Sequence, residues 1–147
     1  MSTYSFLDVT ATLVASGISI DLGAGASVAE EGIEINPVGD KNTMTIGADG
    51  EGMHSLHADK SGNVILRYLK TSPVNAKLMA AYDAQSLSSS LWGTNLIRIS
   101  NPTVGDIAAA RSCAFKRRPN LKYAKDADIV EWHFDAIKTD IILGEYS

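Results

Sequence analysis

The stretch S-P-V-N-A-K-L-M-A-A-Y-D-A-Q, residues 72–85, is the one segment of this chain whose pattern is clearly helical. Ser72 can cap a helix, and Pro73 takes the first helical position, where its missing N–H does no harm. The inward stripe is predicted to contain Val74, Leu78, Ala81, Tyr82 and Gln85, with Met79 beside it. The opposite face of the helix is expected to be exposed to water, with Asn75, Lys77 and Asp83 on it. A helix with one apolar stripe needs a surface to cover.

The segments on both sides of this helix supply that surface, because they alternate between apolar and polar residues as half-buried strands do. In the first segment the apolar face carries Leu7, Val9, Ala11 and Leu13, and the polar face carries Asp8, Thr10 and Thr12. A reversal at Ser16-Gly17, followed by alternation over Ile18, Ile20 and Leu22, predicts a hairpin. The predicted fold is mainly β: one domain over residues 1–147, an antiparallel β-sandwich or barrel with one flanking helix at about residues 73–85.

Further strands are predicted along the chain, at Gly32–Asn36, Val64–Tyr68 and Asn95–Ser100, the last with Ile97 and Ile99 inward. Residues 105–115 are ambiguous, because Asp106 before an alanine-rich run can also begin a helix. We favour a strand whose one face carries Ile107, Ala109, Cys113 and Phe115. The longest alternating segment is Asp128–Ile142. Its two faces are Val130, Trp132, Phe134 and Ala136, against Ile129, Glu131, His133, Asp135 and Ile137.

A long connection, Pro37–Asn63, separates the early strands from the helix. Within it, Asn42–Gly47 reads as a strand with Met44 and Ile46 on one face. The string G-A-D-G-E-G at Gly47–Gly52 is too flexible and too acidic for a core. Connections of this length are usually functional or disordered. We therefore interpret this region as a candidate arm.

The composition excludes several classes of protein. Hydrophobic content of 45% and charged content of 20% are globular values. A net charge of −4 argues against a protein that holds nucleic acid by its phosphates. No apolar run is long enough for a membrane span, and Met1–Tyr4 begins no signal segment. The lone Cys113 excludes an internal disulfide and fits a reducing, cytoplasmic origin.

Candidate chemistry is sparse. The string His54-x-x-His57-x-Asp59 has metal-binding residue types, but on a strand the two histidines point to opposite faces, so polar loop residues are the favoured interpretation. Cys113 lies in an apolar pattern and is expected to be a buried thiol. Glu131 and Asp135 lie about 13 Å apart on a strand, too far for paired acid–base work.

Two glycine strings, Gly23–Gly25 and Gly47–Gly52, lack the lysine and the strand–helix setting of a phosphate loop. The basic loop Lys116–Arg118, with Lys122 and Lys125, has the charge to bind phosphates. In an acidic protein with few aromatics nearby, a solvated loop or a contact with another protein chain is the favoured interpretation. We predict no catalytic residue and no cofactor.

Several strings together resemble one family of bacteriophage structural proteins, the tail tube subunits of contractile-tailed phages. These strings are Y-S-F-L-D-V at 4–9, D-K-N-T-M-T-I-G-A-D-G-E-G-M-H-S-L-H at 40–57, K-T-S-P-V-N-A-K-L-M at 70–79, L-W-G at 91–93, A-F-K-R-R-P at 114–119 and V-E-W-H-F-D-A-I-K at 130–138. The resemblance runs over nearly the whole chain and keeps the order of the segments. It implies a fold related to the tube protein of type VI secretion.

The resemblance also implies a function. Hexameric rings stack into a hollow tube through which the genome passes without specific binding. The tube belongs to the virion tail, is assembled in the cytoplasm of the bacterial host, and meets the sheath, the baseplate and tape-measure or terminator proteins. Alternatives are another tube component, such as a terminator or a type VI-like secreted ring protein, and, from a different class, a β-barrel that binds a small molecule.

Residue roles follow as expectations. The lumen-facing candidates are Asp8, Thr10 and Thr12, or Glu131 and Asp135, because a lining without excess positive charge does not hold DNA. The candidates for contact with a neighbouring subunit or ring are Met44, Ile46, Asp49, Glu51, Met53, His54 and His57. The helix packs through Val74, Leu78 and Tyr82. Its outer face and the basic loop of Lys116, Arg117 and Arg118 are expected to meet the sheath or another tail protein.

Overall fold

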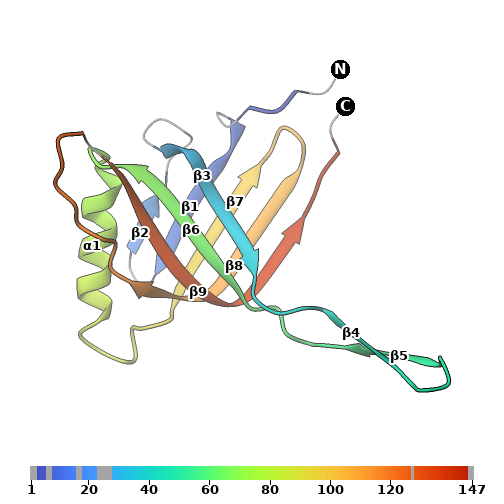
Figure 1. Cartoon of the computed structure of the whole chain (residues 1–147). Coiled ribbons are helices and arrows are strands. Elements are labelled where there is room, and N and C mark those ends of the chain that lie inside the picture. The colour runs from blue at the N-terminus through green and yellow to red at the C-terminus, as the bar shows by residue number, and fades with distance from the viewer. Residues whose placement is uncertain (1–2, 6–7, 16–17, 23–27, 127, 146–147) are drawn as a thin grey trace.

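The computed structural model describes residues 3–5, 8–15, 18–22, 28–126 and 128–145, with the backbone alone for residues 28–31. Its strands are β1 (Thr10–Ala15), β2 (Ile18–Asp21), β3 (Val28–Pro37), β4 (Asn42–Ile46), β5 (Gly52–Leu56), β6 (Gly62–Leu69), β7 (Asn95–Asn101), β8 (Asp106–Arg117) and β9 (Ile129–Ile142). The helix is α1 (Val74–Gln85). Leu7, Ser16-Gly17 and Gly23–Gly25, named in the predictions above, lie outside the described residues. The fold is mainly β with antiparallel pairing, as predicted (Figure 1).

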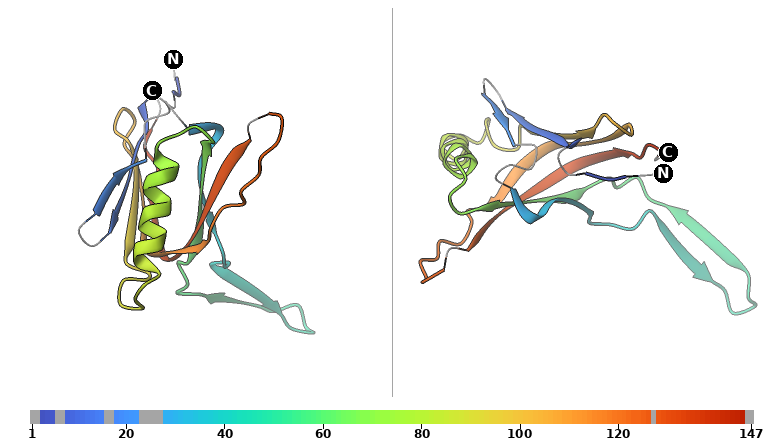
Figure 2. Two further views of the ribbon diagram at one scale, coloured as in Figure 1. Left: turned by 90° about the vertical axis from the view of Figure 1, so that its left-hand side faces the viewer. Right: turned by 90° about the horizontal axis from the view of Figure 1, so that it is seen from above.

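Seven strands form one sheet in the order β2-β1-β7-β8-β9-β6-β3. The sheet curls strongly, and α1 lies beside β2 on one side of the curl (Figures 1 and 2). Every neighbouring pair is antiparallel. The sheet therefore ends at two edge strands, β2 and β3, and among the described residues neither has a second strand neighbour.

The core fills the inside of the curl. Its largest fully buried side chains come from alternate positions of β1, β6, β7 and β9: Leu13, Val64, Leu66, Tyr68, Ile97, Trp132 and Phe134. The phenol of Tyr68 donates a hydrogen bond to the carbonyl of Leu22 (2.8 Å), and burial raises its pKa. The alternation predicted for residues 128–142 is confirmed up to Ile137, with Trp132, Phe134 and Ala136 buried, whereas no residue from Lys138 to Ile142 is buried.

The helix follows its predicted pattern. The Val74 N–H donates to Ser72 Oγ (3.3 Å), and Pro73 already has helical dihedral angles, so both residues act at the helix start as expected. The buried positions of α1 are Val74, Leu78, Ala81 and Gln85. Tyr82 packs edge-on against the rings of Trp92 and Phe115, with ring centroids 5.8 and 5.5 Å away. The three helix-packing residues therefore face the core.

Asn75 corrects one expectation, because it does not simply face water. Its amide donates to the Leu69 carbonyl (3.0 Å), and its Oδ1 accepts from the indole N–H of Trp132 (3.1 Å). A buried indole needs a hydrogen-bond acceptor, and the first turn of the helix provides it.

The inward face predicted for residues 105–115 is wrong for Ile107 and Ala109. Ile107 is exposed, whereas Ala110, Cys113 and Phe115 are buried. The physical reason is a β-bulge: Ile97 pairs with Ala110 but Asn95 pairs with Cys113, so β8 gains one residue and its side chains change face. Ser112, between these pairs, has a positive φ of 52°.

The end of α1 is tied to the sheet by a buried pair of amides. Gln85 Nε2 donates to Asn95 Oδ1 (2.7 Å), and Asn95 Nδ2 donates back to Gln85 Oε1 (2.9 Å). The Asn95 amide also reaches the Cys113 carbonyl (3.1 Å) at the bulge. Helix, β7 and β8 therefore meet at one point where each polar group has a partner.

Candidate functional site

The region predicted as an arm is a hairpin that leaves the body of the molecule. Strands β4 and β5 form a separate two-stranded sheet that extends beyond the end of β3 and β6 (Figure 1). The strand at Asn42–Ile46 was expected, but β5 was predicted as part of a glycine-rich loop and is instead regular strand. At its root, Gly62 has no room for a side chain, because a Cβ would lie 2.8 Å from the Asn36 carbonyl oxygen.

The hairpin exposes apolar side chains on both faces. The pairs Asn42↔Leu56 and Met44↔His54 place Met44, Ile46 and Leu56 on one face, as the alternation predicted for the first two. These three side chains are 62%, 54% and 82% exposed. Met53 is exposed too, and pairs with Thr45 on the other face. A two-stranded hairpin with no buried face gains little from its apolar residues until another surface covers them.

The acidic string at the tip is a hydrogen-bonded turn, and it lies outside the core as predicted. The Gly47 N–H donates to the Glu51 carbonyl (2.7 Å), and the Glu51 N–H donates to Asp49 Oδ1 (3.1 Å). Gly50 has a φ of 88°, a conformation that glycine adopts without strain. Both carboxylates of the tip, Asp49 and Glu51, are exposed.

The histidines of the arm stand on opposite faces, as their spacing indicated. The Asn42 amide donates to His54 Nδ1 (3.2 Å), whereas His57 Nε2 lies 2.6 Å from Thr43 Oγ1. Asp59 accepts the Ser61 N–H (2.8 Å), and hydrogen bonds with the Ser61 side chain, first, and with this N–H lower the pKa of the Asp59 carboxyl. Within the described residues no cluster of His, Cys, Asp and Glu has a geometry that holds a metal ion.

The two candidate lumen surfaces lie on different strands of the sheet. Thr10 and Thr12 are on the non-core face of β1, where Thr10 Oγ1 lies 2.8 Å from Ser100 Oγ, and Asp8 precedes that strand and is exposed. Glu131 and Asp135 are exposed on β9, and β7 and β8 stand between β1 and β9. The structure does not bring the two sets together.

The surface around β9 carries a cation as well as carboxylates. Arg67 Nη1 lies 3.0 Å from Glu34 Oε2, and Arg67 Nε lies 3.9 Å from Glu131 Oε1. His133 Nε2 lies 3.4 Å from Glu131 Oε2. The sequence analysis did not predict these ion pairs. The signal was Arg67, a charged residue in the otherwise apolar strand β6, because such a residue often forms an ion pair across the sheet.

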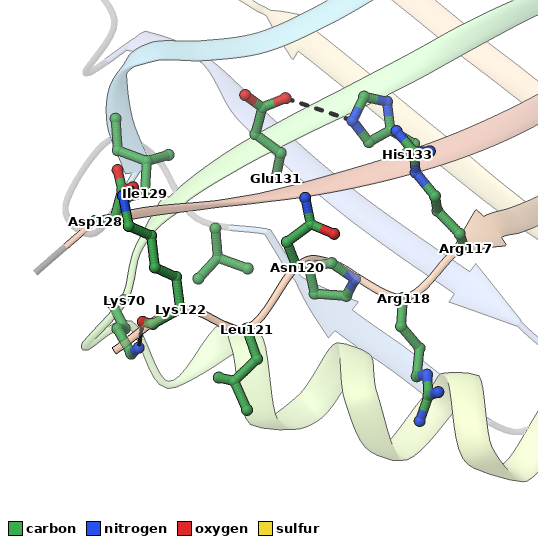
Figure 3. A pocket seen from close by; sticks show the side chains of 12 residues that line it. Lys70, Arg117, Arg118, Asn120, Leu121, Lys122, Asp128, Ile129, Glu131 and His133 are labelled. Atoms are coloured by element: carbon green, nitrogen blue, oxygen red, sulfur yellow. Dashed lines mark hydrogen bonds and ion pairs between the residues drawn. The ribbon is translucent and has the colours of Figure 1, made fainter. Parts of the chain in front are cut away.

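Lys116 and Arg117, predicted in a loop, are instead the last residues of β8, and the loop begins at Arg118. This basic segment forms one wall of a groove, which we call the basic groove (Figure 3). It has a volume of about 480 Å³, and its cationic lining is Lys70, Arg117, Arg118 and Lys122. Lys122 pairs with Asp128 (3.7 Å), and Lys70 donates to the Lys122 carbonyl and lies 3.8 Å above the Tyr123 ring. Of the carboxylates in the described part of the chain, none pairs with Lys116, Arg117 or Arg118.

Cys113 has no exposed surface and donates weakly to the Ala110 carbonyl (Sγ to O, 3.2 Å). Burial raises the pKa of its thiol to about 12, which opposes a nucleophilic role. Among the described residues, no helix is both long and apolar enough to cross a membrane.

Comparison with known proteins identifies a family and structures of the same fold. The family described as "Bacteriophage PhiTE tail tube protein" matches residues 1–144. No curated protein matches the chain.

Solved structures share the fold. A chain of the sheath–tube complex of the PVC extracellular contractile injection system is 11% identical, with a TM-score of 0.60 over 96% of this chain and 92% of that one. A chain of the PVC sheath/tube terminator is 12% identical, with a TM-score of 0.61 over 97% and 98%. A chain of the six-fold symmetrised baseplate of the anti-feeding prophage is 11% identical, with a TM-score of 0.61 over 97% of each chain.

Proposed function

The chain belongs to the bacteriophage PhiTE tail tube protein family, and on that basis we propose that it is the repeating subunit of the hollow tube of a contractile tail. It is a structural protein of the virion tail and not an enzyme. In the proposal, copies close into hexameric rings, the rings stack, and the genome leaves through the channel. Assembly takes place in the cytoplasm of the bacterial host.

One observation carries the ring: the sheet is open. Strands β2 and β3 end the seven-stranded order, and each presents a row of backbone groups that a further strand can pair with. Closing such sheets across subunits into one continuous barrel removes both edges in every copy at once. The six-fold symmetry of the anti-feeding prophage baseplate, whose chain shares this fold, supports the hexameric ring.

The arm supports stacking. Its exposed Met44, Ile46 and Met53 have no surface to cover within the described residues, and a neighbouring subunit or ring supplies one in this proposal. Asp49, Glu51, His54 and His57 then lie at that contact. Burial of the three apolar side chains contributes on the order of 1.5–3 kcal/mol each if it is complete.

The channel surface follows from the need to pass DNA without holding it. Either candidate face, Asp8 with Thr10 and Thr12 or Glu131 with Asp135, suits a lumen because each carries carboxylates that repel DNA. Beside β9, Arg67 of β6 is already engaged by Glu34 and Glu131, whereas Arg98 of β7 lies opposite Thr12 on the first face. The phosphates of DNA therefore meet few unpaired cations on the β9 surface and gain little by binding to it.

The outside of the tube meets other tail proteins in this proposal. The solved neighbours come from a sheath–tube complex, a terminator and a baseplate, which supports sheath, baseplate and tape-measure or terminator proteins as partners of this chain as well. We assign the outer face of α1, where Lys77 and Asp83 are exposed, to the sheath side.

A second candidate is a tube terminator, because the terminator chain of the PVC system shares the fold to the same extent. Negative-stain electron microscopy of the purified chain separates the candidates. Long hollow tubes support the tube subunit, and isolated rings that never elongate support the terminator. A chain that stays monomeric at high concentration, by sedimentation velocity, overturns both.

A further inference from the structure

We propose that the basic groove receives the acidic tip of the arm, Gly47–Gly52, from a second copy of this chain in the next ring. Asp49 and Glu51 of one subunit then face Arg117 and Arg118 of the other. This inference rests on the proposed stacking of subunits and names the surface on which the arm lands.

The position of the two elements in the fold is the first argument. Strand β6 begins at Gly62, at the root of the arm, and its last residue, Leu69, is followed by Lys70, which lines the groove. The Lys70 end of the groove lies at the opposite end of the β6–β9 pair from the arm (Figures 1 and 2). Arg117 pairs with His133, which pairs with Ile65 in the middle of β6, so the groove reaches to about 10 Å from the level of Gly62 at the usual rise per residue. Copies repeated in one orientation along this direction bring the arm of each to the groove of the next, a head-to-tail contact that can repeat indefinitely.

Charge is the second argument. The sequence from Asn42 to His57 contains Asp49 and Glu51 but no lysine or arginine. Asp49 uses one oxygen to accept the Glu51 N–H, which fixes the carboxylate in the turn and leaves its second oxygen for a cation. Arg117 and Arg118 bring guanidinium groups, which bind carboxylates through paired hydrogen bonds.

The other charges of the groove are already engaged, so they do not compete. Lys122 is paired with Asp128, and Glu131 contacts Arg67 and His133. Unlike these groups, Arg117 and Arg118 have no carboxylate partner within the described residues (Figure 3). The groove therefore keeps two cations for an incoming acidic segment.

A second basic cluster lies at the wrong end of the fold. Lys60 and Arg111 both contact Asp140, at 3.6 and 3.1 Å, and Lys60 stands beside the root of the arm. The two cations share one carboxylate, but a copy displaced along β6 does not present this cluster to the arm tip. The basic groove is the better acceptor because of its position.

Cross-linking tests the contact directly. The double variant Asp49→Cys/Arg118→Cys, oxidised under conditions in which wild-type protein forms tubes, is expected to give a ladder of covalent oligomers on a non-reducing gel. The matched control Asp49→Cys/Lys77→Cys, with the second cysteine on the exposed face of α1, is expected to give none; the native Cys113 is buried. Tubes without a ladder overturn this inference and leave the proposed function intact. Wild-type protein that forms no tubes overturns the proposed function and this inference with it.

Charge reversal tests the chemistry. Arg117→Glu/Arg118→Glu is expected to raise the protein concentration needed for tube growth about tenfold, which corresponds to a loss of about 1.4 kcal/mol per contact. Adding Asp49→Lys/Glu51→Lys to the same chain is expected to restore growth, and Lys138→Glu, at an exposed position of β9 outside the groove, is the control that leaves it unchanged. Failure of the rescue overturns the pairing. Normal tubes that no longer bind sheath protein overturn it too, and assign the groove to the sheath.

Discussion

The β4–β5 hairpin and the seven-stranded sheet are both built from alternating strands, yet they treat their apolar side chains in opposite ways. In the sheet, Leu66 and Ile97 have no exposed surface, whereas in the hairpin Leu56 is 82% exposed and Ile46 54%. The sheet and α1 therefore build the core, and no residue of β4 or β5 is buried in it. We expect folding and assembly to depend on separate parts of this sequence, and the free energy of unfolding measures the first of these without the second.

The largest effect is expected at Trp132, which is fully buried and bonded to Asn75. Trp132→Ala should lower the free energy of unfolding by about 3–5 kcal/mol, because it leaves a cavity among the core rings. Urea unfolding followed by far-UV circular dichroism measures this. Leu56→Ala, in the arm, is the control, with an expected change within about 0.5 kcal/mol. A comparable loss in both variants would contradict the separation.

The next effect is expected at the buried amides. Asn95→Ala should lower the free energy of unfolding by about 1–3 kcal/mol, because Gln85 and the Cys113 carbonyl lose their partner inside the protein. Asn42→Ala removes an exposed amide of the arm, bonded to His54, and should have almost no effect. Gln85→Ala/Asn95→Ala should cost less than the sum of the single changes in a double-mutant cycle. Strict additivity would show that the two amides are not coupled.

The body of the protein could be predicted from the sequence because its strands have a simple period. Alternation alone separated Trp132 and Phe134 from Glu131 and Asp135, and the start of α1 followed from Ser72 and Pro73. The location of the arm followed from its length and its glycines.

What the sequence did not reveal depends on pairings between distant segments. The bulge in β8 uses a positive φ at Ser112, a residue type that gives no warning of that conformation, so Ile107 was placed on the wrong face. The basic groove needs both Lys70 and Arg117 in its lining, and only the pairing of β9 with both β6 and β8 puts them on one groove. The alternation of apolar and polar residues within one segment carries no information on the bulge or on the groove.

A smaller effect, again confined to the body, is expected at alkaline pH. Burial raises the pKa of Cys113 from 9.0 to about 12, so above pH 9 the unfolded chain releases a proton that the folded chain keeps. The contribution of this thiol is therefore complete below pH 9 and is lost as pH rises toward 12, by about 1.4 kcal/mol at pH 10. Urea midpoints at pH 8 and pH 10 should differ accordingly, and the difference should shrink in Cys113→Ala. An unchanged difference in that variant would exclude the thiol as the cause.

The smallest effect on folding is expected from deletion of Gly47–Gly52, with a change in the free energy of unfolding within about 0.5 kcal/mol, because the turn touches no buried group of the body. The same deletion is expected to abolish tube growth in negative-stain images, since the arm loses its tip. Replacing the segment with a glycine-serine string of equal length distinguishes the length of the arm from the charge of its tip. The arm keeps its length but loses both carboxylates, so tube growth should weaken without disappearing. Normal tubes from the deleted chain would contradict the assignment of the hairpin as the stacking arm. A large loss of folding stability would instead show that arm and body are one cooperative unit, because a segment that is independent of the core cannot change the unfolding equilibrium of that core.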